Sequence, residues 1–404
     1  MRKVFLMFLL CFCLVSSGLF AKEFKIGVAV ALTGKFGKAG NLVKDAYTYW
    51  QEKVNKNGGI SVKGKKYPVK IIFYDDKSDP ATGAKMIDRL INRDRVDLLL
   101  GGFGSSQVFA ESAVAEKYGF PLISGAASSN KLFERGFKCY FSTLGKATEE
   151  VKGCVYAFSK LKNKPKTAAI VGADILFTSL ACEGFKKYCN ENGIKVVHFE
   201  LFPMRLQDYN SLFLKVKEKN PDVLFVGSHL LVAMRTIKAL KEINYTPKGI
   251  AFSYGPTVPK FVADLKGDAN YVVAASEWTP NLPYKGGVLG SASDFAKEYS
   301  KKFGRSPDYV EAASAGGAVV QQLAIESLGL TPPLKDSDRE KIVKWLHNNS
   351  VNTFYGKIKF DKDGANIAHP ALAVQIQNGV KKTVYPDNVK DGELIYPMKP
   401  WKDR

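Results

Sequence analysis

Two loops rich in glycine and serine are the segments of this sequence best suited to hold an anion. One reads Gly102-Phe103-Gly104-Ser105-Ser106, and the other spans residues 125–130 and contains Ala126 and Ser128. Glycine lets backbone N–H groups approach a ligand closely, and the start of a helix presents unpaired N–H donors with partial positive charge. The loops therefore predict a cradle for a carboxylate or a phosphate. The alternative is that Ser105, Ser106 and Ser128 only cap helices.

The sequence lacks the spacings expected of a nucleotide site, a hydrolase or a metal centre. Gly102 and Gly104 are not followed by the third glycine of a dinucleotide-binding fingerprint, nor by the lysine of a Walker motif. The sequence also lacks the Gly-x-Ser-x-Gly motif of a hydrolase nucleophile elbow. Asp75 and Asp76 would point to opposite faces of a strand, so we interpret them as a turn that organises a loop. No metal-spaced pair occurs among the four histidines, which are His198, His229, His347 and His369. We therefore expect a protein that is not an enzyme and uses no cofactor or metal.

The candidate loops follow strands in a regular alternation of strand and helix patterns. Strands are expected at residues 24–32, 69–74, 97–101 and 121–124, with helices at 42–55, 81–92 and 106–118 between them. The alternation restarts with helices at 148–161, 179–192, 210–219 and 233–244 and strands at 167–172, 195–200, 223–226, 249–252 and 271–275. This order predicts two α/β units whose parallel sheets carry helices on both faces. Ligands bind beyond the carboxyl ends of such strands.

The last third of the chain exceeds what the second unit needs. Helices are expected at 294–303, 312–328 and 339–348, and strands at 355–360 and 371–377 form a late β pair. The segment 361–364, with two aspartates and a glycine, is a turn after the first of these strands.

The amino terminus has the order of a secretory signal peptide. Arg2 and Lys3 precede an apolar run at 4–15, and Ala21 stands just before charged residues. The alternative, a membrane anchor, is disfavoured because about a dozen apolar residues are too few to cross a bilayer. Neither Cys11 nor Cys13 follows the small residues that a lipoprotein cut needs. We predict cleavage of residues 1–21 and export to the periplasm.

The exported chain would keep 383 residues and a formal charge of +18, enough length for two domains. The basic residues are spread along the chain, so the charge indicates a solvated surface or attraction to anionic solutes, and we expect no nucleic-acid partner. Four cysteines remain, and their pairing is left open among three connectivities. They are Cys139, Cys154, Cys182 and Cys189.

Motifs in order along the chain resemble the leucine/isoleucine/valine-binding proteins, the solute receptors of ABC importers. The match covers nearly the whole mature chain, and its specificity comes from the order and spacing of motifs that are weak singly. They are Lys25-Ile26-Gly27-Val28, Leu32-Thr33-Gly34, Asn57-Gly58-Gly59-Ile60, Tyr74-Asp75-Asp76, Asp79-Pro80, Gly104-Ser105-Ser106, Ser124-Gly125-Ala126-Ala127, Phe354-Tyr355-Gly356 and Phe360-Asp361.

The resemblance implies a type I periplasmic binding fold, in which two doubly wound lobes are joined by three crossings and close on a ligand. It places the crossings near 143–145, 277–280 and 353–357. The first lobe would contain residues 22–143 and 279–354, and the second would contain residues 144–278 and 355–404. The return of the chain to the first lobe explains the surplus helices.

The resemblance also implies the ligand-binding residues. The serine that holds the ligand carboxylate matches Ser105, and the contacts on the next strand match Ala126 and Ser128. Two tyrosines of the family fall at Phe177 and His229, and its acid for the ligand ammonium falls near Gly255-Pro256, where no acid stands. Phe103, Ser106 and Glu311 complete the expected site, and Glu311 is the acid that can replace the missing one.

The expected ligand is therefore a small carboxylate-bearing solute, either an amino acid or a related organic or aromatic acid. Without the family's acid, an apolar or aromatic carboxylate fits the site better than leucine does. The resemblance implies a monomer that hands its solute to the permease subunits of an ABC importer. The alternative is an exported sensor of the same fold that signals to a chemoreceptor or kinase.

Overall fold

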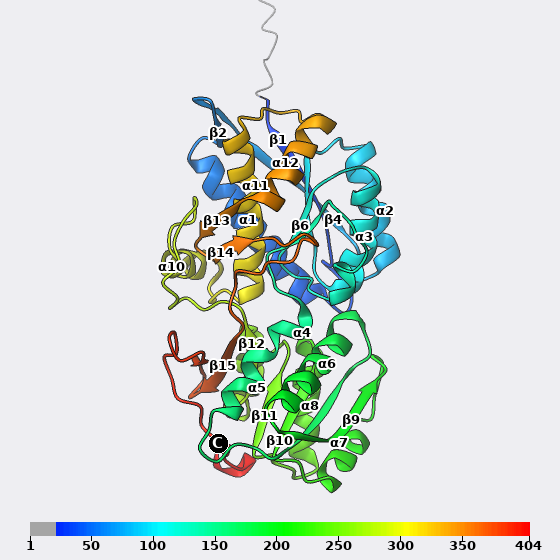
Figure 1. The fold of residues 1–404 in the computed structure, drawn as a ribbon, viewed down its shortest axis with the longest axis vertical. Helices are drawn as coiled ribbons and strands as arrows, with labels where there is room; N and C mark the ends of the chain where they lie inside the picture. The colour runs from blue at the N-terminus through cyan, green and yellow to red at the C-terminus, as the bar shows by residue number, and fades with distance from the viewer. Residues whose placement is uncertain (1–21) are drawn as a thin grey trace, which may run out of the picture.

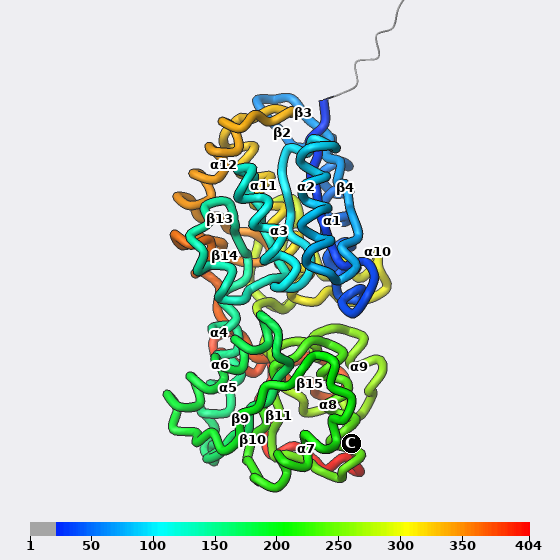
Figure 2. Tube along the Cα trace, turned by 90° about the vertical axis from the view of Figure 1, so that its right-hand side faces the viewer, coloured from blue at the N-terminus to red at the C-terminus, as the bar shows by residue number. Residues whose placement is uncertain are grey.

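A computed structural model describes residues 22–404 of the chain, in which two α/β lobes are stacked along the long axis of the molecule (Figures 1 and 2). The expected signal peptide, residues 1–21, lies outside the described residues. Each lobe is built on its own mainly parallel sheet with helices on both faces, which confirms the predicted fold class. In the described residues, no helix combines the length and apolarity needed to cross a membrane.

The first lobe has a five-stranded parallel sheet in the order β4-β1-β5-β6-β7. Its strands are β1 (Phe24–Val30), β4 (Val69–Asp75), β5 (Leu98–Leu100), β6 (Leu122–Ser124) and β7 (Tyr140–Ser142). The first lobe also contains two separate short hairpins. One pairs β2 (Ile60–Val62) with β3 (Lys65–Tyr67), and the other pairs β13 (Ser350–Thr353) with β14 (Gly356–Lys359). Its helices are α1 (Gly37–Lys56), α2 (Pro80–Asn92), α3 (Ser105–Lys117), α10 (Ala292–Phe303), α11 (Tyr309–Leu328), α12 (Asp336–Asn348) and the 3₁₀ turn η1 (Asn130–Leu132).

The second lobe has a seven-stranded sheet in the order β16-β15-β12-β11-β10-β8-β9, antiparallel only where β15 joins. Its strands are β8 (Thr167–Ala173), β9 (Lys195–Phe202), β10 (Val223–Gly227), β11 (Gly249–Phe252), β12 (Val273–Ser276), β15 (Leu372–Gln377) and β16 (Val380–Tyr385). Its helices are α4 (Ala147–Glu150), α5 (Lys152–Ser159), α6 (Leu176–Glu191), α7 (Tyr209–Glu218), α8 (Leu230–Glu242), α9 (Pro259–Leu265), η2 (Lys266–Ala269) and η3 (Trp401–Asp403).

Apolar side chains alternate between the two faces of each sheet and bury both. In β8, Ala168 and Ile170 pack with α5 and α6, whereas Ala169 and Val171 face the side covered by α7 and α8. The period of two in a strand sends neighbouring side chains to opposite faces. The near-continuous apolar runs in the sequence are explained by this double coverage.

The helix expected at 148–161 is broken into α4 and α5 at Val151. Val151 lies between the two helices with φ −81° and ψ −8°, and it is fully buried against the second sheet. The short helix α4 directly follows the first crossing between the lobes, and it ends at Glu150. The break therefore gives Glu150 a place at the junction of the lobes.

The late β pair expected at 355–360 and 371–377 is wrong. The first strand pairs with β13, whereas the second pairs with β12 and β16. Between them the chain returns to β7, because Ser142 donates its N–H to Gly364 O at 2.8 Å and accepts from Asn366 N at 3.1 Å. Residues 364–366 therefore lie beside β7 of the first sheet, whereas the resemblance placed residues 355–404 in the second lobe.

The four described cysteines are all unpaired and buried: Cys139, Cys154, Cys182 and Cys189. Burial raises the pKa of the Cys182 and Cys189 thiols to about 12. Cys182 fills the space between two sheet glycines, with Gly172 on one side and Gly227 on the other. These thiols therefore act as small core side chains.

Candidate functional site

A small cavity lies at the junction of the lobes and is lined by both of them. Its volume is about 20 Å³, which has room for about one water-sized group. We call it the anchor cavity. It is lined by Phe103, Ser105, Ala126, Ser128, Tyr309 and Val310 of the first lobe, Leu144 and Glu150 at the first crossing, and Phe177, His229 and Tyr254 of the second lobe.

Ser105 joins the two polar loops of the first lobe. Its hydroxyl oxygen accepts hydrogen bonds from Ser128 N at 3.2 Å and from Ser129 N at 3.1 Å. Helix α3 begins at Ser105, and Gly104 precedes it with φ 98°, where a side chain would be strained. No side-chain cap closes this helix, so Ser105 does not act as its cap. The Ser105 proton and the first N–H groups of α3 remain available to an anion.

Tyr309 reaches the cavity because α11 begins against the end of β6. A side chain at Gly125 would come within 2.2 Å of Ser314 N, so only glycine permits this approach. Thr143 adds a hydrogen bond from its hydroxyl to Ala313 O at 2.9 Å. The buried start of α11 is thereby held beside the loop that carries Ala126 and Ser128.

His229 lies among aromatic rings from both lobes. Its ring centroid is 5.0 Å from that of Phe36, 5.7 Å from Phe103 and 5.3 Å from Phe177. Burial, and the nearby Lys35, lower the pKa of His229 to about 4, so the imidazole is neutral at pH 7. Its buried Nδ1 has no hydrogen-bond partner within the described chain. A neutral imidazole can give or accept one hydrogen bond at a ligand.

A larger and mostly apolar cavity adjoins the anchor cavity and shares Phe103, His229 and Tyr254 with it. Its volume is about 250 Å³, and we call it the apolar annex. Lys35 and Lys38 contribute to its wall from the first lobe. The other lining residues are Gly34, Phe36, Ala39, Met204, Leu230, Leu231 and Met234. Together the two cavities offer a polar end and an apolar body, the usual composition of a small-molecule site.

The loop that carries Phe36 is organised by the end of β4. Asp75 accepts hydrogen bonds from Leu32 N at 2.9 Å and Thr33 Oγ1 at 2.6 Å. Ser78 accepts from Phe36 N at 3.0 Å and is itself held by Asp76. The interpretation of Asp75-Asp76 as a loop-organising turn is confirmed.

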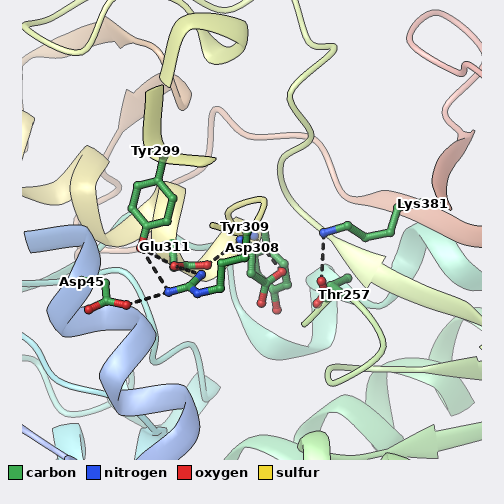
Figure 3. Close-up of polar contacts among 8 residues, drawn as sticks. Asp45, Thr257, Tyr299, Asp308, Tyr309, Glu311 and Lys381 are labelled. Atoms are coloured by element: carbon green, nitrogen blue, oxygen red, sulfur yellow. Dashed lines mark hydrogen bonds and ion pairs between the residues drawn. The ribbon is translucent and has the colours of Figure 1, made fainter. Parts of the chain in front are cut away.

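Three of the residues expected in the site do not line the anchor cavity. Ser106 is half-buried on α3 and is absent from the cavity lining, and Gly255 packs against the start of α8 near Leu230 and Ala233. Glu311 is fully buried within the first lobe and is engaged by Arg305 Nη1 at 2.6 Å (Figure 3). It also accepts from Asp308 N and Tyr299. Glu311 is therefore neutralised by the lobe's own arginine and does not replace the missing acid.

The acid in the cavity is Glu150, which sequence reasoning missed together with Leu144, Tyr254, Tyr309 and Val310. These residues are far apart in the chain and come from different elements, so no local pattern marks them. The one available signal was the position of Glu150 directly after the first crossing. Among the described residues, no cluster of histidine, cysteine and carboxylate side chains is arranged to hold a metal ion.

Two lobes joined by three crossings, with a cavity lined from both sides, define a two-lobed solute-binding protein. The sequence profile of the periplasmic binding protein family matches residues 23–381, and the chain belongs to this family. One relative is the Leu/Ile/Val-binding protein homolog 7 of Brucella melitensis. It is 23% identical over 394 residues, which cover 93% of this chain and 94% of the relative.

Solved structures share the fold. A branched-chain amino acid transporter substrate-binding protein of Streptococcus pneumoniae in complex with isoleucine has a TM-score of 0.76 at 20% identity, covering 90% of this chain and 100% of its own. An ABC transporter solute-binding protein of R. palustris in complex with benzoate has a TM-score of 0.74 at 15% identity, covering 90% and 95%. These relatives are solute-binding proteins, and the chain is one of that kind and not an enzyme.

Proposed function

We propose that this protein captures a small carboxylate-bearing solute, an amino acid or a related organic or aromatic acid, between its two lobes. The observation that carries the proposal is the pairing of the two serine loops with the annex. Ser105 and Ser128 face a cavity with room for a polar head, and the annex beside it takes an apolar body. Isoleucine and benzoate, the ligands of two structural neighbours, both have this composition.

The roles of the site residues follow from their chemistry. Ser105, Ser128 and the start of α3 receive the carboxylate, because hydroxyl and N–H donors stabilise a buried anion. Ala126 lies beside them on the second loop. Phe103 and Phe177 cover the apolar body, and neutral His229 gives one hydrogen bond where the head meets the body.

The second part of the proposal concerns delivery. A signal peptide at residues 1–21 exports the chain to the periplasm, where the closed monomer hands its solute to the permease subunits of an ABC importer. Family membership and the names of the relatives support this assignment. We further propose that the first lobe comprises residues 22–143 and 279–366, and the second lobe 144–278 and 367–404. The hydrogen bonds between Ser142 and residues 364–366 support this boundary.

The proposal is tested first by native mass spectrometry of protein purified without refolding. A retained solute that contains a carboxyl group is the expected result, and a retained solute without one would overturn the proposal. Delivery is tested separately by uptake of that labelled solute into cells with and without this gene. Unchanged uptake in the deletion strain would contradict the importer role and leave the binding role intact.

A further inference from the structure

Glu150 is a buried carboxyl group that lines the anchor cavity with one oxygen free. The residue is 2% exposed, and its Oε1 has no hydrogen-bond partner within the described chain. It stands beside Ser128, one of the two serines proposed to receive the ligand carboxylate. A buried acid without a counter-ion costs free energy when it is ionised, so burial favours the protonated form of Glu150.

Glu277 is a second buried acid near Glu150, and it links the first two crossings to the segment before the third. Its Oε1 accepts from Gly145 N at 3.0 Å on the first crossing, and its Oε2 accepts from the Tyr355 hydroxyl at 2.8 Å. Glu277 itself follows β12 on the second crossing, and Tyr355 lies in the segment before the third. Glu150 and Glu277 line a common cavity of about 390 Å³ on the hinge side. Burial, and after it the charge of Glu277, raise the pKa of Glu150.

Within residues 22–404, Glu150 is surrounded by acidic and phenolic groups and has no basic partner. The groups that face it across the packed elements are Glu277, the Tyr309 hydroxyl on α11 and the Tyr355 hydroxyl, with the neutral His369 stacked on Tyr355. The hinge-side cavity also contains Lys146, which lies 3.9 Å from Asp361, as well as Lys152 and Glu149, which pairs with Lys187. No ion pair joins a lysine, arginine or histidine to Glu150 in the described residues. A cationic group of the ligand can therefore pair with Glu150.

We propose that Glu150 recognises a cationic nitrogen of the ligand and releases its own proton to solvent when the nitrogen binds. The inference rests on the proposed function and deepens it, because it assigns to the ligand a carboxylate and an ammonium, the ends of an α-amino acid. The acid comes from α4 after the first crossing and not from the Gly255-Pro256 position. Glu277 has a positioning role, since its hydrogen bonds to Gly145 and Tyr355 connect the carboxyl pair to the first two crossings.

Calorimetry at pH 6 tests the inference with two matched pairs of probes, leucine with 4-methylpentanoate and phenylalanine with 3-phenylpropanoate. The wild-type protein should bind the amino acid of at least one pair roughly 10- to 100-fold more tightly than its deaminated partner. Repeating the titration in two buffers of different ionisation enthalpy should show release of about one proton per amino acid bound. Glu150→Gln should lower the preference about tenfold or more and abolish the proton release.

Glu149→Gln is the matched control, since it makes the same change one residue earlier at the surface pair with Lys187. Thermal melting establishes that both variants fold. A Glu150→Gln protein that keeps both the preference and the proton release would overturn the inference, as would a wild-type preference for a deaminated acid. If none of the four probes binds, the solute retained in native mass spectrometry decides. A carboxylate without a basic nitrogen overturns this inference alone, whereas a solute without a carboxyl group overturns the proposed function.

Discussion

At the scale of single residues, the two serines of the anchor cavity differ in what else they hold. Ser105 bonds two backbone N–H groups of the neighbouring loop, whereas the Ser128 hydroxyl faces the cavity and Glu150. Ser128→Ala should therefore weaken ligand binding by roughly 1.5–3 kcal/mol with little change in melting temperature. Ser105→Ala should weaken binding by a similar amount and also lower the melting temperature, because two buried N–H groups lose their acceptor.

Calorimetry with the retained solute and thermal melting of the apo protein measure the two effects. Ser106→Ala is the control, since Ser106 belongs to the same loop but does not line the cavity. Normal binding by both cavity variants would contradict the assignment of the carboxylate to this loop pair.

The buried Glu277 carboxyl predicts a dependence of stability on pH. Burial raises the pKa of Glu277 from 4.5 to about 7, so folding favours the protonated acid. Its contribution to the free energy of unfolding is complete below pH 4.5 and is lost as the pH rises through 7. The pKa values of Asp76 and Glu311 are also raised to about 7, so these two acids act in the same direction. The pKa values of His229 and His369 are lowered to about 4, so these histidines affect stability only below pH 6.5.

The apo protein should therefore melt at a lower temperature at pH 8 than at pH 6.5. Glu277→Gln should reduce this drop, because glutamine does not titrate. Scanning calorimetry of dialysed wild-type and variant proteins at four pH values gives the comparison. An identical pH dependence in the two proteins would show that Glu277 titrates normally.

At the scale of elements, helix α8 sets the size of the annex. Met234 lies on its cavity side, next to Leu230 and Leu231. Met234→Trp should fill part of the 250 Å³ annex and weaken binding of phenylalanine or a retained bulky solute, at a cost of about 1–3 kcal/mol. The binding of alanine, whose side chain ends near the anchor cavity, should change less.

The control is Leu214→Trp, which adds the same ring at an exposed position of α7. Competition of phenylalanine and alanine against a fluorescent or labelled solute reports both affinities. Equal losses for the two amino acids in the Met234 variant would place the ligand body outside the annex.

In the molecule as a whole, the two lobes are also in contact outside the anchor cavity. Asp308 of the first lobe is buried beside Tyr254, Thr257 and Lys381 of the second, and Lys381 donates to Thr257 O at 2.9 Å (Figure 3). Opposite charges at this place stabilise the closed state relative to an open one. A ligand that touches both lobes adds to the same preference.

Lys381→Met should therefore shift the ligand-free protein toward the open state and weaken solute binding about threefold to tenfold without removing a ligand contact. Small-angle scattering should show a smaller radius of gyration for the wild-type protein at saturating solute than without it. Lys381→Met should have a larger radius of gyration than the wild-type protein, and it should need a higher solute concentration to reach the smaller radius. A radius that stays constant on saturation would contradict closure of the lobes.

The sequence alone predicts the two α/β units and the two Gly-Ser loops that line the anchor cavity. Apolar runs separated by turns specify strands buried on both faces, and the Gly-Ser loops must follow those strands wherever the sheets pack. Phe103, Ser105, Ala126 and Ser128 could be placed in this way because they lie in the loops that follow strands. Phe177 and His229 were placed by the resemblance to the family.

The acid of the anchor cavity depends on how distant elements pack together. Glu150 looks like an ordinary charged residue in a helical segment, and only the break between α4 and α5 at the hinge buries it. Glu277, Tyr309 and Tyr355 reach it from segments more than a hundred residues away. Glu311 had the right charge but lies under Arg305. Burial and charge pairing depend on which elements pack together, and local sequence patterns do not contain that information.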